Sequence, residues 1–253
     1  MQPQKIVSRG EWLEARKEHL KNEKALTRLG DMVSAERRTL PWVKVEKNYA
    51  FETTAGKKPL SQLFGDNSQL IVQHFMWRHD LDQGCVGCSL HTDHAQGAIT
   101  HLANHDVSFV VVSRAPLDRL QAYRKRMGWD VEWVSSLNSD FNFDYHVSFT
   151  KEQLEGSVEY NYETIDGANA MDELPGLSVF YQDERGQIFH TYSSYARGNE
   201  EAISTFFYLD LTPKGRNETE IMDWVRRRDE YDKSAQPACH STAPAAKSAR
   251  SIT

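Results

Sequence analysis

Short apolar runs alternate with longer helical segments through the middle of this chain. Apolar runs at 69–77, 107–113 and 131–135 predict strands, and segments 88–104 and 117–127 predict the helices between them. A helix that joins two strands in this way produces a parallel β-α-β unit. The alternation therefore restricts the chain to an α/β fold with a partly parallel sheet.

The segment before these units predicts a helical arm. Ser8 and Glu11 have the spacing of a capping box, and the apolar residues that follow have helical spacing, interrupted near Gly30. We assign residues 1–45 to this arm, which could cap the sheet or mediate dimerisation, so a homodimer is one expected assembly.

The segment after the units has two parts. Residues 177–181 and 187–192 flank the turn cluster 183–186, which predicts a hairpin that completes a domain spanning 46–233. Residues 234–253 are rich in Ala, Ser, Pro and Lys without periodicity, which predicts a disordered tail and leaves Cys239 without a role.

Charge and hydropathy exclude several classes of function. The net charge is −6 and 39% of the 253 residues are hydrophobic, so nothing favours nucleic acid as a partner, and Arg226–Arg228 are interpreted as a solvated helix face. No apolar stretch approaches the roughly 18 residues of a membrane span, and no signal core follows Met1. We expect no membrane association and a cytoplasmic location, where thiols rest largely reduced.

The strongest functional signal is the pair Cys85 and Cys88, which follows the run 69–77 and opens the segment predicted as a helix. Unpaired N–H groups at a helix N-terminus stabilise a thiolate, and a second cysteine one turn later can resolve a mixed disulfide. The pair predicts a thiol–disulfide oxidoreductase with Cys85 as nucleophile, Cys88 as resolving thiol, no cofactor, and a thiol or disulfide substrate, either protein or small molecule.

A zinc site is the main alternative interpretation of the same residues. Cys85, Cys88, His91 and His94 form a C-x2-C-x2-H-x2-H pattern of ligands that zinc prefers. On a continuous helix, nine residues turn the side-chain direction by roughly half a circle, which disfavours a site containing both Cys85 and His94. In the competing interpretation, His91 and His94 are polar surface positions.

Several further segments together resemble a known family: 36–43, 74–76, 84–85 with 88–89, 112–116, 126–129, 139–142, and 190–193 with 195–198. They are similar to uncharacterised bacterial and fungal proteins catalogued as domain of unknown function 899, which are regarded as thioredoxin-like. The resemblance implies a thioredoxin-like three-layer sandwich with an N-terminal helical extension and a disordered C-terminal tail. It implies a dithiol without an established reaction, so a non-catalytic binding protein of this fold stays an alternative.

The thioredoxin-like resemblance suggests further site residues. His74 lies where such proteins often carry a group that moves protons for the buried cysteine, although it could be a hydrogen-bonded core histidine. Pro175 and Gly176 lie where thioredoxin-like proteins place a cis-proline and use the adjoining backbone to hold an extended substrate. Arg114 follows a strand and could bind an anion, or be a surface ion pair. Trp77 could line a substrate groove, or belong to the core.

Other enzyme classes lack their motifs. Peroxiredoxin-like thiol peroxidases have a motif that resembles P-x-x-x-T-x-x-C. In this chain Asp82 stands at the threonine position, three residues before Cys85, and Arg78 stands at the proline position, seven residues before it. The phosphate-binding pattern G-x-x-x-x-G-K-[ST] and the nucleophile elbow G-x-S-x-G are both absent from the sequence. A thiol peroxidase is therefore the less favoured redox alternative.

Overall fold

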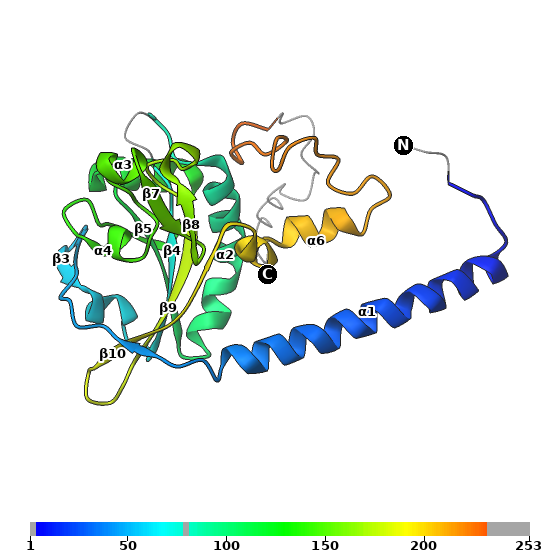
Figure 1. Cartoon of the computed structure of the whole chain (residues 1–253), viewed down its shortest axis with the longest axis horizontal. Helices are drawn as coiled ribbons and strands as arrows, with labels where there is room; N and C mark the ends of the chain where they lie inside the picture. The colour runs from blue at the N-terminus through cyan, green and yellow to red at the C-terminus, as the bar shows by residue number, and fades with distance from the viewer. Residues whose placement is uncertain (1–3, 78–80, 232–253) are drawn as a thin grey trace, which may run out of the picture.

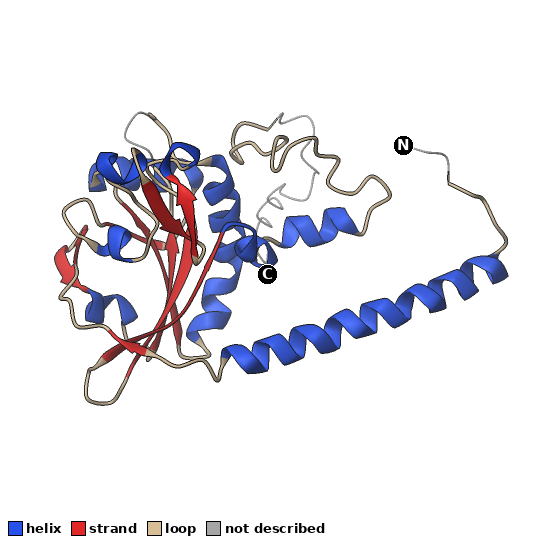
Figure 2. Ribbon diagram, viewed as in Figure 1, coloured by secondary structure: helices blue, strands red, loops and turns tan. Residues whose placement is uncertain are grey.

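A computed structural model describes residues 4–77 and 81–231 (Figures 1 and 2). Its helices are α1 (Arg9–Arg37), α2 (Val86–Ala103), α3 (Leu117–Met127), α4 (Phe141–Asp144), α5 (Lys151–Leu154) and α6 (Ser204–Asp210), with short 3-10 helices η1 (Leu60–Phe64), η2 (Gly167–Asn169) and η3 (Ala196–Ala202). Its strands are β1 (Val43–Lys44), β2 (Ala50–Thr53), β3 (Gly56–Pro59), β4 (Gln69–His74), β5 (Val107–Ser113), β6 (Glu132–Ser135), β7 (Ser157–Tyr160), β8 (Glu163–Asp166), β9 (Gly176–Gln182) and β10 (Ile188–Tyr195).

The main sheet has eight strands in the order β1-β10-β9-β4-β5-β6-β2-β3. β4 pairs in parallel with β5, which pairs in parallel with β6, and helices α2 and α3 make the crossovers. β4 pairs on its other side with β9, antiparallel, and β9 forms a hairpin with β10. A central β-α-β unit extended by an antiparallel hairpin is the arrangement of a thioredoxin-like fold, and the predicted fold class is confirmed.

Strand β5 shows why the domain has three layers. Phe109 and Val111 point to the face covered by α2 and α3, while Val110 and Val112 point to a second core that includes Phe141 of α4. Both faces of a strand are buried when helices cover both sides of a sheet, so the strand reads as a continuous apolar run. This explains the run at 107–113 in the sequence.

The predicted elements of the core are confirmed with small changes at their ends. β5 and α3 have the predicted bounds, and β4, β6, α2 and the β9–β10 hairpin differ by a few residues. Two details are wrong. Helix α1 runs through Gly30 without interruption, and Arg226–Arg228 lie in turns and irregular chain rather than on a helix.

The arm projects from the body of the molecule (Figure 1). The capping box of Ser8 and Glu11 is present at the start of α1, and none of the helix residues is buried. The sheet already begins at Val43, because β1 pairs with β10, so its first strand lies inside the segment 1–45. The predicted tail at 234–253, with Cys239, lies outside the described residues. No helix in the described part of the chain has the length and apolarity needed to cross a membrane.

Candidate active site

The two cysteines lie at the start of α2, where β4 ends. Cys85 is the N-cap residue, and its sulfur accepts a hydrogen bond from the Cys88 backbone N–H at 3.4 Å. The Cys88 side chain is 5% exposed, and its sulfur accepts from the Met76 backbone N–H at 3.5 Å. Both cysteines are free thiols. The first thiol of the pair is therefore more accessible than the second, which is buried.

The surroundings of the two sulfurs separate their acidities. A hydrogen bond from the Cys88 thiol is the largest cause that lowers the pKa of Cys85, to about 6. The backbone N–H groups of Cys88 and Gly87 and the charge of Arg227 lower this pKa further, while burial opposes them. The same thiol hydrogen bond, followed by burial, raises the pKa of Cys88 above its ordinary value. At neutral pH, Cys85 is the thiolate and Cys88 keeps its proton.

A small cavity of about 120 Å³ adjoins both cysteines. Met222, from the segment 218–231 that we call the strap, is one of its lining residues. A Cβ atom on Gly87 would lie 2.9 Å from the Met222 sulfur, so a side chain at position 87 would push Met222 away. The Val86-Gly87 dipeptide between the cysteines therefore fits a dithiol that is covered by the strap.

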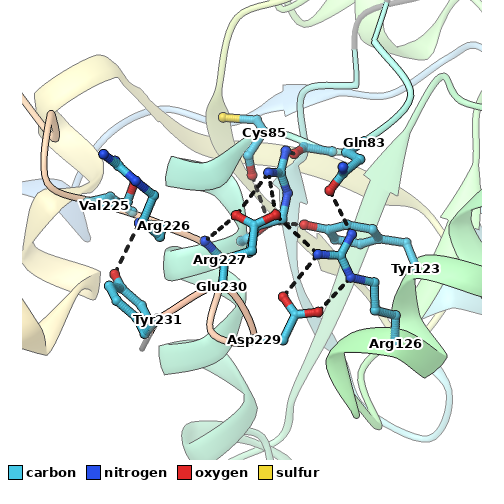
Figure 3. A network of polar contacts seen from close by, with 12 residues as sticks. Gln83, Cys85, Tyr123, Arg126, Val225, Arg226, Arg227, Asp229, Glu230 and Tyr231 are labelled. Atoms are coloured by element: carbon cyan, nitrogen blue, oxygen red, sulfur yellow. Dashed lines mark hydrogen bonds and ion pairs between the residues drawn. The ribbon is translucent and has the colours of Figure 1, made fainter. Parts of the chain in front are cut away.

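The strap also brings a cation to the dithiol. Arg227 donates to the Gly84 carbonyl oxygen at 2.7 Å and forms an ion pair with Glu230 at 3.1 Å, and its side chain is 15% exposed (Figure 3). Arg126 of α3 anchors the strap through Asp229 at 2.6 Å. The interpretation of Arg227 as part of a solvated helix face is wrong, because this side chain packs over the loop that carries Cys85.

A buried acid, Glu173, lies beside the dithiol and was not singled out from the sequence. Its carboxylate accepts from the Trp77 backbone N–H at 2.6 Å, and the residue is 5% exposed. Burial is the main cause that raises the pKa of Glu173 to about 8; the negative charges of Asp172 and Cys85 act in the same direction, and the Trp77 hydrogen bond and Arg114 act in the opposite direction. Its charge also raises the pKa of Cys88. Only its position two residues before Pro175 could have drawn attention to it.

His74 is among the lining residues of the dithiol cavity, but its ring is turned away from the dithiol helix. Successive residues of a strand face opposite sides of the sheet, and the Gln73 amide on one side donates to the Cys88 carbonyl oxygen at 3.0 Å. The His74 ring packs near Phe141 on the other side, and its Nε2 lies 2.8 Å from Ser178 Oγ. Burial lowers the pKa of His74 to about 3. The geometry supports the alternative interpretation, a hydrogen-bonded core histidine, and does not support a proton acceptor for Cys88.

Pro175 and Gly176 do line the dithiol cavity. The described residues contain no cis peptide bond, so the bond before Pro175 is trans. Gly176 is paired with His74 on one side and with Tyr195 on the other. Because both edges of this strand are paired inside the sheet, its backbone is not free to add an extended substrate strand.

Trp77 and Arg114 lie together in a second cleft, of about 770 Å³, which Glu173 also lines. The Trp77 side chain is 5% exposed and belongs to the aromatic core, as its alternative interpretation stated. The Arg114 guanidinium lies 4.3 Å from the centre of the Phe143 ring. Trp77 and Arg114 therefore do not line the small dithiol cavity, and Glu173 is the residue that connects their cleft with the dithiol.

The predicted zinc ligands are not gathered around one point. His91 is buried rather than on the surface, and burial lowers its pKa to about 4. His94 is held through both ring nitrogens, by Thr205 Oγ1 at 2.7 Å and Ser204 Oγ at 2.8 Å. Among residues 4–77 and 81–231, no three His, Cys, Asp or Glu side chains are grouped as a metal ion requires.

The fold and the site together define a thioredoxin-like protein with two free thiols at the start of its first core helix. The sequence model of the family described as bacterial protein of unknown function (DUF899) matches residues 1–231. The chain belongs to this family, as the resemblance of its segments implied. No curated protein matches the sequence at a significant level.

Solved structures that match this chain at very low identity include peroxiredoxins. A structure of peroxiredoxin Q from Xanthomonas campestris is 9% identical, with a TM-score of 0.43, over 62% of this chain and 85% of that chain. The peroxidoxin BcpB from Mycobacterium tuberculosis is 13% identical, with a TM-score of 0.40, over 66% of this chain and 95% of that chain. Function must therefore be argued from the site itself.

Proposed function

We propose that this protein is a thiol–disulfide oxidoreductase in which Cys85 attacks and Cys88 resolves. The observation that carries the proposal is the position of Cys85 at the N-cap of α2, where it accepts from the Cys88 backbone N–H and has a pKa of about 6. A thiolate at neutral pH is the form that attacks disulfides. The buried, protonated Cys88 is one turn away and is suited to the second step.

The reaction has two exchange steps. The Cys85 thiolate attacks one sulfur of a disulfide, forms a mixed disulfide with it and expels the other sulfur as a thiolate, which takes a proton from water. Cys88 then loses its proton, attacks the Cys85 sulfur and expels the second substrate thiolate. Two electrons have passed from the dithiol to the substrate, and an external thiol reductant restores the dithiol through the same steps in reverse.

Glu173 is the group best placed to accept the proton of Cys88 in this proposal. With its pKa raised to about 8, it can both take and return a proton near neutral pH. The charge of Cys85 helps to keep Glu173 protonated in the resting site. When Cys85 enters the mixed disulfide, that charge disappears and Glu173 becomes a carboxylate more readily, at the step where Cys88 must be deprotonated.

The covered dithiol favours a small disulfide over a folded protein as substrate. Met222 of the strap lines the cavity beside Cys85 and lies against Gly87, and the strand edge at Gly176 is already paired. A large substrate would therefore have to displace the strap. Oxidised glutathione and a protein disulfide, supplied at equal concentration, should oxidise the dithiol at different rates, with the small disulfide faster.

Two serine variants test the mechanism. Cys88→Ser should accumulate a mixed disulfide with a small thiol on a non-reducing gel or in an intact mass, because the intermediate forms but its internal exit is gone. Cys85→Ser should trap little. Equal trapping by both variants would contradict the assigned roles. A parent protein that never forms the Cys85–Cys88 disulfide at any redox poise would support the non-catalytic binding protein, and bound zinc lost equally in both variants would support the metal site.

A further inference from the structure

A further cavity, of about 240 Å³, shares no lining residue with the dithiol cavity and lies between β10, the β7–β8 hairpin and the chain after α4. Four tyrosine rings line it: Tyr145, Tyr160, Tyr162 and Tyr195. The centres of Tyr160 and Tyr195 are 5.4 Å apart with their planes at 60°, and those of Tyr162 and Tyr195 are 5.6 Å apart at 69°. Rings inclined in this way form adjoining walls, and we call this space the tyrosine cavity.

The hydroxyl groups of three of these tyrosines are already used by the backbone. Tyr160 donates to the Pro175 carbonyl oxygen at 2.7 Å, and Tyr162 donates to that of Ser193 at 2.8 Å. Tyr195 donates to the Tyr145 carbonyl oxygen at 3.1 Å. These bonds fix the rings in place, so what the three rings offer to an occupant is aromatic surface rather than hydroxyl donors.

Two carboxylates line the tyrosine cavity. They belong to Asp144 and Glu159, and none of the lining residues, all in the described part of the chain, is a lysine or an arginine. Lys47, which does not line the cavity, partly balances the charge of Asp144, because its Nζ lies 2.6 Å from Asp144 Oδ2. Aromatic surface and carboxylates both attract a cation, because the face of an aromatic ring carries negative potential.

His190 adds a hydrogen-bond acceptor to the lining. Its Nε2 lies 3.0 Å from the Tyr192 carbonyl oxygen, which can only accept, so Nε2 carries the proton. Burial lowers the pKa of His190, which keeps the ring neutral. Nδ1 is then an unprotonated acceptor, and it has no partner among the residues that the structure describes.

The turn that presents Tyr162 is strained, and the residue is unusually exposed. Asn161 and Tyr162 have φ values of 53° and 65°, which a two-residue hairpin turn requires at both positions but which an aromatic residue seldom adopts. The Tyr162 side chain is nevertheless 76% exposed, so burial in a core does not offset the strain. Strained residues gather at ligand sites, where the held geometry serves binding.

We propose that the tyrosine cavity binds the ammonium group of a small organic cation, at a site distinct from the dithiol. The rings enclose the cation, the carboxylates balance its charge, and His190 Nδ1 accepts from an N–H or O–H group that the ligand carries. This proposal does not depend on redox activity.

Isothermal titration of the full-length protein with choline and with n-butylammonium tests the proposal. The neutral isostere of choline, 3,3-dimethylbutan-1-ol, has the same shape without the charge and should bind about tenfold more weakly or worse, because it lacks the cation–π attraction. Absence of saturable binding by both ammonium probes, or equal affinity for the isostere, would overturn the proposal.

Variants at exposed positions locate the site. Tyr162→Leu should weaken binding of the ammonium probes by about fivefold or more, whereas Tyr162→Phe, which keeps the ring, should stay within about threefold of the parent. Tyr208→Leu is the matched control, because Tyr208 of α6 is 66% exposed and does not line the cavity. Loss of binding in the control, or no loss in Tyr162→Leu while circular dichroism shows a folded protein, would place any binding elsewhere and refute this site.

Discussion

At the scale of residues, the reactivity of the site depends on Cys85 being a thiolate while its neighbour is not. The local donors come from the start of α2 itself, chiefly the Cys88 thiol and the backbone N–H groups of Cys88 and Gly87. The cation comes from Arg227, which is 143 residues from the Gly84 carbonyl that it binds. Local sequence thus sets most of the acidity of Cys85, and tertiary structure adds to it.

Arg227→Gln should raise the pKa of Cys85, because the variant loses a positive charge that stabilises the thiolate after the hydrogen bonds of Cys88 and Gly87 have acted. We expect an upward shift of about half a pH unit in the midpoint of the alkylation rate against pH. Arg226→Gln is the control, since Arg226 donates to the Asp223 and Val225 carbonyl oxygens on the same strap. An unchanged midpoint in Arg227→Gln would show that this charge does not act on the thiolate.

Glu173 should make folding stability depend on pH. The folded protein keeps its proton up to a pKa of about 8, while the unfolded chain releases it near 4.5. The contribution of Glu173 to the free energy of unfolding is therefore complete below the pKa of the unfolded chain and is lost as the pH rises through the folded pKa of about 8. Relative to Glu173→Gln, the parent should lose on the order of 3 kcal/mol in unfolding free energy between pH 5 and pH 9. Urea titrations of both reduced proteins measure this difference, and parallel curves would contradict it.

The parts of the site that the sequence predicts are those made by neighbouring residues. Cys85 and Cys88 could be assigned because the end of a strand and the start of a helix lie within a few residues of them. Arg227 and Glu173 could not, because nothing local connects either to the dithiol. Strand alternation could have predicted the orientation of His74. Its neighbour Phe75 faces the helices, so His74 must face the opposite side of the sheet.

At the scale of elements, the strap affects both the access of reagents to Cys85 and the pKa of the Cys85 thiol. The same segment carries Met222, which lines the cavity beside Cys85, and Arg227, which stabilises the thiolate. Val225, 1% exposed, is its apolar anchor. A movement of the strap would therefore expose the dithiol and, because Arg227 moves away, also raise the pKa of Cys85 and reduce the fraction of thiolate.

Two truncations separate the strap from the end of the chain. Removal of residues after Ser234 should leave stability and the Cys85 pKa unchanged, because the strap stays complete. Removal of residues after Asn217 should raise the Cys85 pKa, speed its reaction with a bulky maleimide relative to iodoacetamide, and cost about 2 kcal/mol of stability through the loss of Val225 burial. Alkylation followed by mass spectrometry gives both rates. Similar behaviour of the two truncated proteins would show that the strap does not cover the thiol in solution.

Elements of the core were predictable because their apolar periodicity extends over many residues. β5 and α3 have seven and eleven residues and were assigned with their observed bounds. The strands β1, β2, β3, β7 and β8 have two to four residues each, too few to show a period. The β7–β8 turn also lacks a glycine, with Asn161 and Tyr162 in its place, so its hairpin signal is weak.

At the scale of the whole molecule, α1 is a 29-residue helix with no buried residue. Leu26, Leu29 and Val33 recur at helical spacing on it and are 70%, 50% and 41% exposed. An amphipathic helix gains most of its stability from packing, so an arm of this length with no residue buried against the described part of the chain is expected to find another surface. A second copy of the chain offers the same apolar stripe, which agrees with the homodimer expected from the sequence.

We therefore predict that the full chain self-associates through α1. The double variant Leu29→Glu, Val33→Glu places charges on the stripe and should convert the dimer to a monomer while the dithiol domain stays folded, because neither side chain contributes to the core. Size-exclusion chromatography with light scattering at several concentrations gives the mass, and Cys85 alkylation reports on the site. Arg28→Glu, at an exposed position of the same helix outside the apolar stripe, controls for added charge. A monomeric parent, or a dimer that survives the double variant, would mean that the arm has a different partner.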